Sequence, residues 1–184
     1  SDVCSSDLPY LYKDNQFDTP TGKGQLFAAP WRAPAETPDA DYPLVLCTVR
    51  EVGHYSCRSM TGNCAALQSL ADEPGRVQIN PADADERGIA EGQLVWVRSR
   101  RGKVITRASI SERINAGAIY MTYQWWIGAC NELTQDNLDP ISRTPETKYC
   151  AVQLEAIEDQ RWAEDFAASA YQTMKTRLIA AVNV

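Results

Sequence analysis

Residues 76–110, RVQINPADADERGIAEGQLVWVRSRRGKVITRASI, carry the clearest structural signals in the chain. The run RVQI (76–79) predicts a short strand. Asn80 is a preferred helix N-cap and Pro81 suits the first helical position, so a short helix is expected to follow. Apolar and polar residues then alternate on either side of Arg101-Gly102, which predicts a β-hairpin.

Outward from this stretch, further strands are expected on both sides. Apolar, β-branched runs predict strands in PLVLCTV (43–49), AIYMTY (118–123) and YCAVQLEAI (149–157), with one more short strand in QLFAAPW (25–31). A short helix is expected in the segment that ends before Pro74. Strands of uneven length with short helices between them indicate a mainly β fold, a barrel with irregular crossovers. The pattern alone leaves a barrel and a sandwich both open.

The C-terminal segment has a different period. Trp162, Phe166, Ala170, Met174 and Leu178 recur at every fourth residue, which gives one apolar stripe along a helix. We expect this helix to pack on the barrel through that stripe. A role of the stripe in holding a cofactor or a partner is a much weaker interpretation.

The composition is that of a soluble globular protein. The 184 residues are 44% hydrophobic and 23% charged, with a net charge of -6. This acidic balance argues against a nucleic-acid partner, and no apolar run is long enough for a membrane helix. We expect a cytoplasmic protein.

The six cysteines form no CxxC pair, and the chain has a single histidine, so no metal site is predicted. We interpret most of the cysteines as buried apolar residues in a reducing compartment. For Cys57 in particular, a buried filler is favoured over a ligand contact.

The first eight residues, SDVCSSDL, match the conceptual translation of a common sequencing adapter. We therefore expect residues 1–8, including Cys4, to be an artefact and the rest to be the tail of a longer protein. The expected organisation is an extended connection (9–42), a barrel (43–156) and a C-terminal helix that packs on it (157–184).

Three polar loops follow predicted strands. They are the opening loop REVGHYSCRSMTGN (50–63), a second loop that starts at Tyr123 and a third that contains Lys148. In the opening loop, Arg50 can pair with a phosphate, and Glu51 can accept from a ribose hydroxyl or a guanine edge. Ser56 can bond a phosphate oxygen. An anion or nucleotide site and a turn stabilised by its own side chains are equally good interpretations of these residues alone.

Two other features of the loops have competing interpretations. His54 lies near Ser56 and Glu51, but catalytic triads are assembled from distant segments, so a binding role is favoured over catalysis. Trp125 and Trp126 could stack on a ring, while a place in the core is at least as good an interpretation.

Four separated stretches resemble, in order, a known family. They are PLVLCTVREVGHYSCRSMTGNC (43–64), INPADADERGIAEGQLVWVRSRRGKVITRA (79–108), GAIYMTYQWWIGACNELT (117–134) and LDPISRTPETKYCAV (138–152). They are similar to the C-terminal molybdopterin-dinucleotide-binding domain of molybdenum oxidoreductases. Within that superfamily they most resemble the catalytic subunit of formate dehydrogenases of the formate-hydrogen lyase type.

The resemblance implies a double-psi β-barrel that covers part of a pair of molybdopterin guanine dinucleotides holding Mo or W. It implies cofactor contacts by Arg50, Glu51, His54 and Ser56 in the opening loop, Tyr123 in the second and Lys148 in the third. Gln124 and Asn131 are weaker candidates beside them. Position 147, where an aromatic residue is expected in relatives, holds Thr147.

The resemblance also implies an activity, the oxidation of formate to CO2, with electron-transfer and hydrogenase subunits as partners. The [4Fe-4S] cluster, the metal ligand and the catalytic residues are expected upstream, so this chain should be inactive by itself, with no catalytic residue among its own. The alternatives are another molybdopterin oxidoreductase, such as a nitrate reductase-like enzyme, and a non-catalytic nucleotide-binding β-barrel module.

Overall fold

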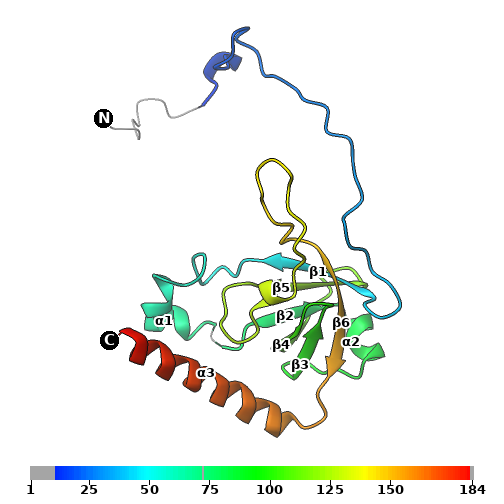
Figure 1. The fold of residues 1–184 in the computed structure, drawn as a ribbon, viewed down its shortest axis with the longest axis vertical. Helices are drawn as coiled ribbons and strands as arrows, with labels where there is room; N and C mark the ends of the chain where they lie inside the picture. The colour runs from blue at the N-terminus through cyan, green and yellow to red at the C-terminus, as the bar shows by residue number, and fades with distance from the viewer. Residues whose placement is uncertain (1–10, 72, 183–184) are drawn as a thin grey trace. The chain divides into compact units, whose positions relative to one another are not determined.

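A computed structural model of the chain describes residues 11–71 and 73–182 (Figure 1). The chain divides into two compact units, Ser1–Ala33 and Pro34–Val184. In the described part of the first unit the only regular element is a short 3-10 helix, η1 (Lys13–Asn15). The expectation for residues 1–8 falls outside the described residues.

The prediction of a strand in residues 25–31 is wrong. These residues have no strand geometry, and Leu26, Phe27 and Trp31 are exposed. A strand needs a neighbour to take its backbone hydrogen bonds, and none of the described strands pairs with this segment. Pro30 also lacks the amide donor that a strand would need.

Six strands close into a barrel in the order β1-β5-β2-β4-β3-β6 (Figure 1). The pairs β1/β5 and β2/β4 are parallel, and the other neighbours are antiparallel. The predicted mainly β barrel is thus confirmed. The strands are β1 (Leu44–Val49), β2 (Arg76–Ile79), β3 (Leu94–Arg98), β4 (Lys103–Ile110), β5 (Ala118–Thr122) and β6 (Cys150–Ala156).

The barrel interior is filled by alternate residues of its strands. In β1, Leu44 and Leu46 are buried while Val45 is half-buried, and β2 alternates exposed and buried residues from Arg76 to Ile79. This period of two directs one face of each strand inward, where it joins a single apolar cluster. The opposite faces of the strands remain available for loops, for α3 and for ligands.

The short helices lie in the connections. They are η2 (Thr61–Asn63), α1 (Ala65–Gln68), α2 (Pro81–Glu86) and η3 (Cys130–Glu132). As predicted, Asn80 caps α2, since its side-chain oxygen accepts from the backbone amide of Ala82 at 2.9 Å. The buried Asp83 of α2 accepts from the amide of Gly117 at 2.8 Å and so fixes the turn before β5.

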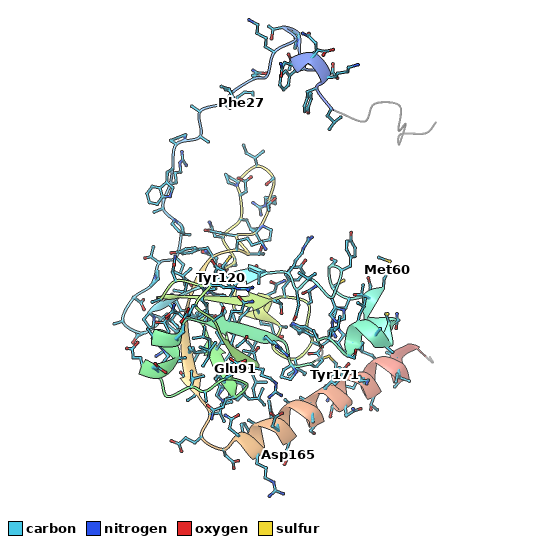
Figure 2. The ribbon with its side chains drawn as sticks, turned by 180° about the vertical axis from the view of Figure 1, so that it is seen from behind. Phe27, Met60, Glu91, Tyr120, Asp165 and Tyr171 are labelled. Atoms are coloured by element: carbon cyan, nitrogen blue, oxygen red, sulfur yellow. The ribbon has the colours of Figure 1, made fainter. Side chains whose placement is uncertain are left out.

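Helix α3 (Gln160–Val182) packs along one side of the barrel (Figure 1), and only part of the predicted stripe is covered there, since Ala170 and Met174 pack against the apolar cluster while Leu178 is exposed. The buried face centres on Ala163 and Ala167, and Figure 2 shows Tyr171 on the side that faces the barrel. Trp162 and Phe166 are 47% and 41% exposed. Small alanines let the helix backbone approach the sheet closely, which leaves the larger rings at the margin of the contact.

Those two rings are nevertheless not isolated. Trp162 and Phe166 stack with centroids 5.2 Å apart, and Phe166 meets Trp96 of β3 edge-on at 6.0 Å. An ion pair from Arg107 of β4 to Glu164, at 2.7 Å, fastens the same side of the helix. Of the helices described in residues 11–71 and 73–182, none is both long and apolar enough to cross a membrane.

The cysteines are only partly the buried residues that we predicted. Cys130 and Cys150 are buried, and burial raises the pKa of their thiols to about 12 and about 11. Cys57 and Cys64 are exposed, so the prediction of a buried Cys57 is wrong. Cys57 lies in the opening loop and Cys64 directly after it. These segments have too few apolar residues to form a core of their own.

Candidate functional site

Two of the three polar loops leave the barrel side by side. Strands β1 and β5 are parallel and in register, with Val49 opposite Thr122. The next residue of each chain segment, Arg50 and Tyr123, therefore emerges at the same end of the barrel. The Nε of Arg50 donates to the phenolic oxygen of Tyr123 at 2.7 Å.

The third loop brings Lys148 to the same place. Strand β6 runs antiparallel to β1, and just before it the Nζ of Lys148 donates to the carbonyl oxygen of Thr48 at 2.7 Å. The Lys148 ammonium and the Arg50 guanidinium each lie 5.9 Å from the centroid of the Tyr123 ring. The three loops thus converge at one end of the barrel, and we call Arg50, Tyr123 and Lys148 the cation cluster.

The cation cluster has the chemistry of an anion site. Lys148 uses one of its three ammonium protons on Thr48, and Arg50 uses Nε on Tyr123. The terminal nitrogens of Arg50 donate to no residue that the structure describes, so this planar fork can take a phosphate or carboxylate. Two cations at one place are notable in a protein of net charge -6.

Glu51 lies next to the cation cluster, and Gln124 fixes its backbone. Gln124 is 2% exposed and bridges two loops: its Oε1 accepts from the amide of Glu51, and its Nε2 donates to the carbonyl oxygen of His54, both at 2.8 Å. Because the oxygen and the nitrogen of its side-chain amide both form hydrogen bonds within the protein, Gln124 links the two loops. The contact to cofactor that we predicted for it is not supported by this geometry.

His54 is also directed inward. Its Nε2 lies 2.9 Å from the carbonyl oxygen of Ala71, its Nδ1 lies 3.0 Å from the hydroxyl of Thr61, and its ring meets Trp125 edge-on. A carbonyl only accepts, so in the neutral ring the proton is on Nε2 and Nδ1 accepts from Thr61. Because His54 is 5% exposed and both of its ring nitrogens are used within the protein, it shapes the opening loop rather than presenting its ring to the cation cluster.

The side chains of Ser56 and Asn131 make no hydrogen bond within the described residues, and Ser56 has a left-handed φ of 47°. Thr147, where an aromatic residue was expected, contributes its carbonyl oxygen, which accepts from the Thr48 hydroxyl at 2.7 Å. That bond holds the third loop against the end of β1 without using the Thr147 side chain.

Sequence reasoning missed the buried pair that supports these loops, Arg58 and Glu73. Their side chains form an ion pair and are 6% and 3% exposed. Glu73 also accepts from the amides of Trp126 and Ile127, at 3.0 and 2.8 Å, and burial raises the pKa of its carboxyl. The Arg58 guanidinium lies 4.5 Å from the ring centroid of Trp125. The sequence gives no sign of this pair. Glu73 lies in a segment for which the sequence pattern predicts only the end of a short helix.

These features define the class of protein: a closed six-strand β-barrel that presents the cation cluster on three loops. Residues 44–151 match the sequence profile of the "Molydopterin dinucleotide binding domain" family, and the chain belongs to that family.

The relatives of the chain are much longer proteins. It is 63% identical over 169 residues to "Formate dehydrogenase H" of Escherichia coli (strain K12), an alignment that covers 92% of this chain and 24% of the relative. It is 41% identical over 147 residues to "F420-dependent formate dehydrogenase subunit alpha" of Methanocaldococcus jannaschii, covering 80% of this chain and 22% of the relative. The chain thus spans about a quarter of the length of these relatives.

Among solved structures, the acetylene hydratase from Pelobacter acetylenicus shares the fold. Its TM-score is 0.60 at 20% sequence identity, with 76% of this chain and 24% of that chain covered. At this level of identity the likeness concerns the arrangement of the barrel and carries no information on the reaction.

Proposed function

We propose that the chain is the cofactor-binding C-terminal part of a formate dehydrogenase that oxidises formate to CO2. The observation that carries the proposal is the convergence of Arg50, Tyr123 and Lys148 in a chain that is 63% identical over 92% of its length to a formate dehydrogenase. The similarity to a second formate dehydrogenase subunit supports the same reaction over that of other molybdopterin oxidoreductases.

The cofactor would be a pair of molybdopterin guanine dinucleotides that hold Mo or W. The residues present fit the anionic part of such a group, since Arg50 and Lys148 offer donors for phosphate oxygens. Tyr123 orients Arg50, and Glu51 supplies an acceptor beside them. When bound, the metal centre would supply the two-electron redox chemistry, while this chain binds and orients the cofactor.

The proposals for the rest of the enzyme, its partner subunits and its location rest on the same similarity to formate dehydrogenases. The [4Fe-4S] cluster and the catalytic groups would belong to the preceding part of the enzyme, against which this domain would close over the cofactor. Electron-transfer and hydrogenase subunits would be its further partners, and the enzyme would be cytoplasmic. We propose the extended connection 9–42, the barrel 43–156 and the C-terminal helix 157–184 as the organisation of the chain.

A graft tests the proposal. Residues 9–184 would replace the matching C-terminal part of the Escherichia coli relative, and bound molybdenum and formate-dependent dye reduction would be measured. We expect the graft to retain metal and to reduce dye. A graft that folds, as judged by circular dichroism, but holds no metal would contradict the proposal.

A further inference from the structure

Residues 25–33 form an apolar segment that is exposed to water. Leu26, Phe27 and Trp31 are 98%, 79% and 83% exposed, and Phe27 is labelled on this segment in Figure 2. Connections that remain in water are usually rich in polar residues, Gly or Pro, whereas this one carries two aromatic rings, a leucine and three alanines. Its composition therefore indicates a segment that another surface covers in the complete enzyme.

The backbone of this segment is straight and its hydrogen-bonding groups are unused. Residues 24–34 contain no helix, turn or bend (Figure 1). Residues 25–33 form no hydrogen bond with any residue that the structure describes. A straight stretch of free amides and carbonyls is what an exposed sheet edge requires of a strand that pairs with it.

The chain on either side of the segment is structured. Before it, the chain makes a tight turn in which the amide of Phe17 donates to the carbonyl oxygen of Gly22 at 3.1 Å. After it, Glu36 accepts from Arg101 and from the amide of Ala151, both at 2.7 Å. The unbonded stretch is thus a defined interval between two structured parts of the chain, rather than a frayed end.

The order of residues in the segment suits a strand at the edge of a sheet. Side chains alternate along a strand, so Phe27 and Trp31 would share one face, about 13 Å apart. Backbone amides alternate between the two edges of a strand, so those of Phe27, Ala29 and Trp31 would point to one edge. Pro30 has no amide hydrogen and belongs to the other edge, which therefore has to face water. The segment can take a neighbour on one edge only.

The barrel of this chain is not a suitable neighbour. Its six described strands form a closed ring in which each strand already pairs on both sides. A closed barrel has no free edge, and this holds equally for the barrel of a second copy. The neighbouring sheet must therefore come from elsewhere. This chain spans only about a quarter of the length of its relatives, so most of such an enzyme lies outside it.

We propose that residues 25–31 add an edge strand to a β-sheet in the preceding part of the enzyme, pairing through the amides of Phe27, Ala29 and Trp31. The inference rests on the proposed function, which supplies that preceding part. Main-chain hydrogen bonds give an added strand its affinity, and pockets for alternate side chains, here Phe27 and Trp31, give it specificity. The strand is absent from the 184-residue chain because the neighbour that completes its hydrogen bonds is not part of that chain.

Amide hydrogen exchange tests the proposal in two proteins, the 184-residue chain and the graft onto the Escherichia coli relative. In the chain alone, the peptide that contains residues 25–31 should exchange like an unstructured peptide. In the graft it should exchange at least about tenfold more slowly, because paired amides exchange only when the pairing opens. Equally fast exchange in both proteins would overturn the proposal.

Two proline substitutions at neighbouring alanines test which edge pairs. Ala29→Pro removes an amide hydrogen from the pairing edge, whereas Ala28→Pro, the matched control, removes one from the edge of Pro30. In the graft, Ala29→Pro should abolish the slow exchange and Ala28→Pro should keep most of it. Neither should change the melting temperature of the 184-residue chain. Equal effects in the graft, or the reverse order, would contradict the pairing. If the Ala29→Pro graft does not fold, the exchange of the unsubstituted graft decides.

The same measurements separate the other possible partners. Slow exchange of residues 25–31 in the dilute chain alone would mean that the chain covers its own segment. Slow exchange that appears only at high concentration, together with a dimer in light scattering, would assign the segment to a second copy. Either result overturns the proposal.

The outcomes also distinguish this inference from the proposed function. A graft that holds metal and reduces dye, while residues 25–31 exchange as fast as in the chain alone, would overturn the inference and leave the proposed function standing. A graft that protects the segment but holds no metal would contradict the proposed function and leave the docking of the segment standing.

Discussion

The Nε of Arg50 donates a hydrogen bond of 2.7 Å to the hydroxyl of Tyr123, which lies 73 residues further along the chain. The contact exists because β1 and β5 are parallel neighbours that end in register. Arg50 and Tyr123 then start two different loops from one edge of the barrel. With Lys148 close to the same ring, the end of the barrel becomes a place where phosphates can bind.

Replacing Arg50 by alanine should weaken cofactor retention in the graft. A charge-assisted bond to phosphate contributes about 1.5–3 kcal/mol, so bound molybdenum should fall about tenfold or more at limiting cofactor. Arg113→Ala is the matched control, because Arg113 is exposed in the turn before β5, at the opposite end of that strand. Metal analysis of both variants checks the prediction, which an equal loss would contradict.

Arg107, an arginine that strand alternation would place on an exposed face, is unsuitable as that control. Its guanidinium bonds both carboxylate oxygens of Glu164, at 2.7 and 2.9 Å, and the carbonyl oxygen of Gly92. Its loss would disturb α3.

Glu36 gives a prediction on pH. It accepts from Arg101 at 2.7 and 2.9 Å and from the amide of Ala151, and the hydrogen bond with Arg101 holds the carboxyl pKa below its usual 4.5. Its stabilisation is thus complete above the unfolded-state pKa and is lost as pH falls through the lower folded-state value. Glu36→Gln should cost about 1–2 kcal/mol at pH 7.

Urea unfolding of the wild type and Glu36→Gln across pH 3 to 7 measures this difference, which should be constant from neutral pH to about pH 5 and should shrink below about pH 4.5. Glu112→Gln, which removes an exposed acid, serves as control. A difference that grows on acidification would show that the ion pair is not its source.

The regular parts of the fold were predictable, because each strand carries its own period of two and each turn its own residues. All six barrel strands lie where alternation and turn signals placed them, and Asn80 caps α2 as expected. The closing order was not predictable from the residues alone. It depends on which strands become neighbours, and no local pattern records that β2 lies between β5 and β4.

In the candidate site, too, some features were predictable from the sequence and others were not. Arg50, Tyr123 and Lys148 follow strands directly, so the strands alone fix their positions. His54 and Gln124 look like ligand contacts in the sequence, yet both are buried and satisfied by the protein. The type of a residue gives what it can bond, whereas the packing of distant segments decides whether that capacity is already used.

Gly75 should tolerate no side chain. A Cβ there would lie 1.8 Å from a ring carbon of the buried Trp125, so Gly75→Ala should destabilise the chain by about 1–3 kcal/mol or more through overpacking. Gly102, in the β3–β4 turn, has nothing within 4 Å of its Cβ position, and Gly102→Ala should change stability by less than about 1 kcal/mol. Thermal unfolding compares the two, and equal effects would refute the packing argument.

Helix α3 offers a test at adjacent positions. Ala167 is 4% exposed against the barrel while Ala168 is exposed. Ala167→Leu should separate the helix from the sheet and cost about 1–3 kcal/mol, whereas Ala168→Leu should be near neutral. Chemical denaturation measures both. Were Ala168→Leu the more damaging variant, the packed face of α3 would have to be reassigned.

The final prediction is that the 184-residue chain alone does not oxidise formate. Its described residues contain no cluster of potential metal ligands, and the cofactor site that we propose at the cation cluster would be closed only by the preceding part of the enzyme. A site that remains open to water lacks the closed surroundings in which redox cofactors and their substrates are oriented. Dye reduction by the purified chain, with formate, molybdate and added cofactor, should equal that of a protein-free control. The graft, assayed in parallel, should be active. Sustained turnover by the chain alone would mean that it contains catalytic groups of its own, and variants of Cys57 and Lys148 would then be the first to examine.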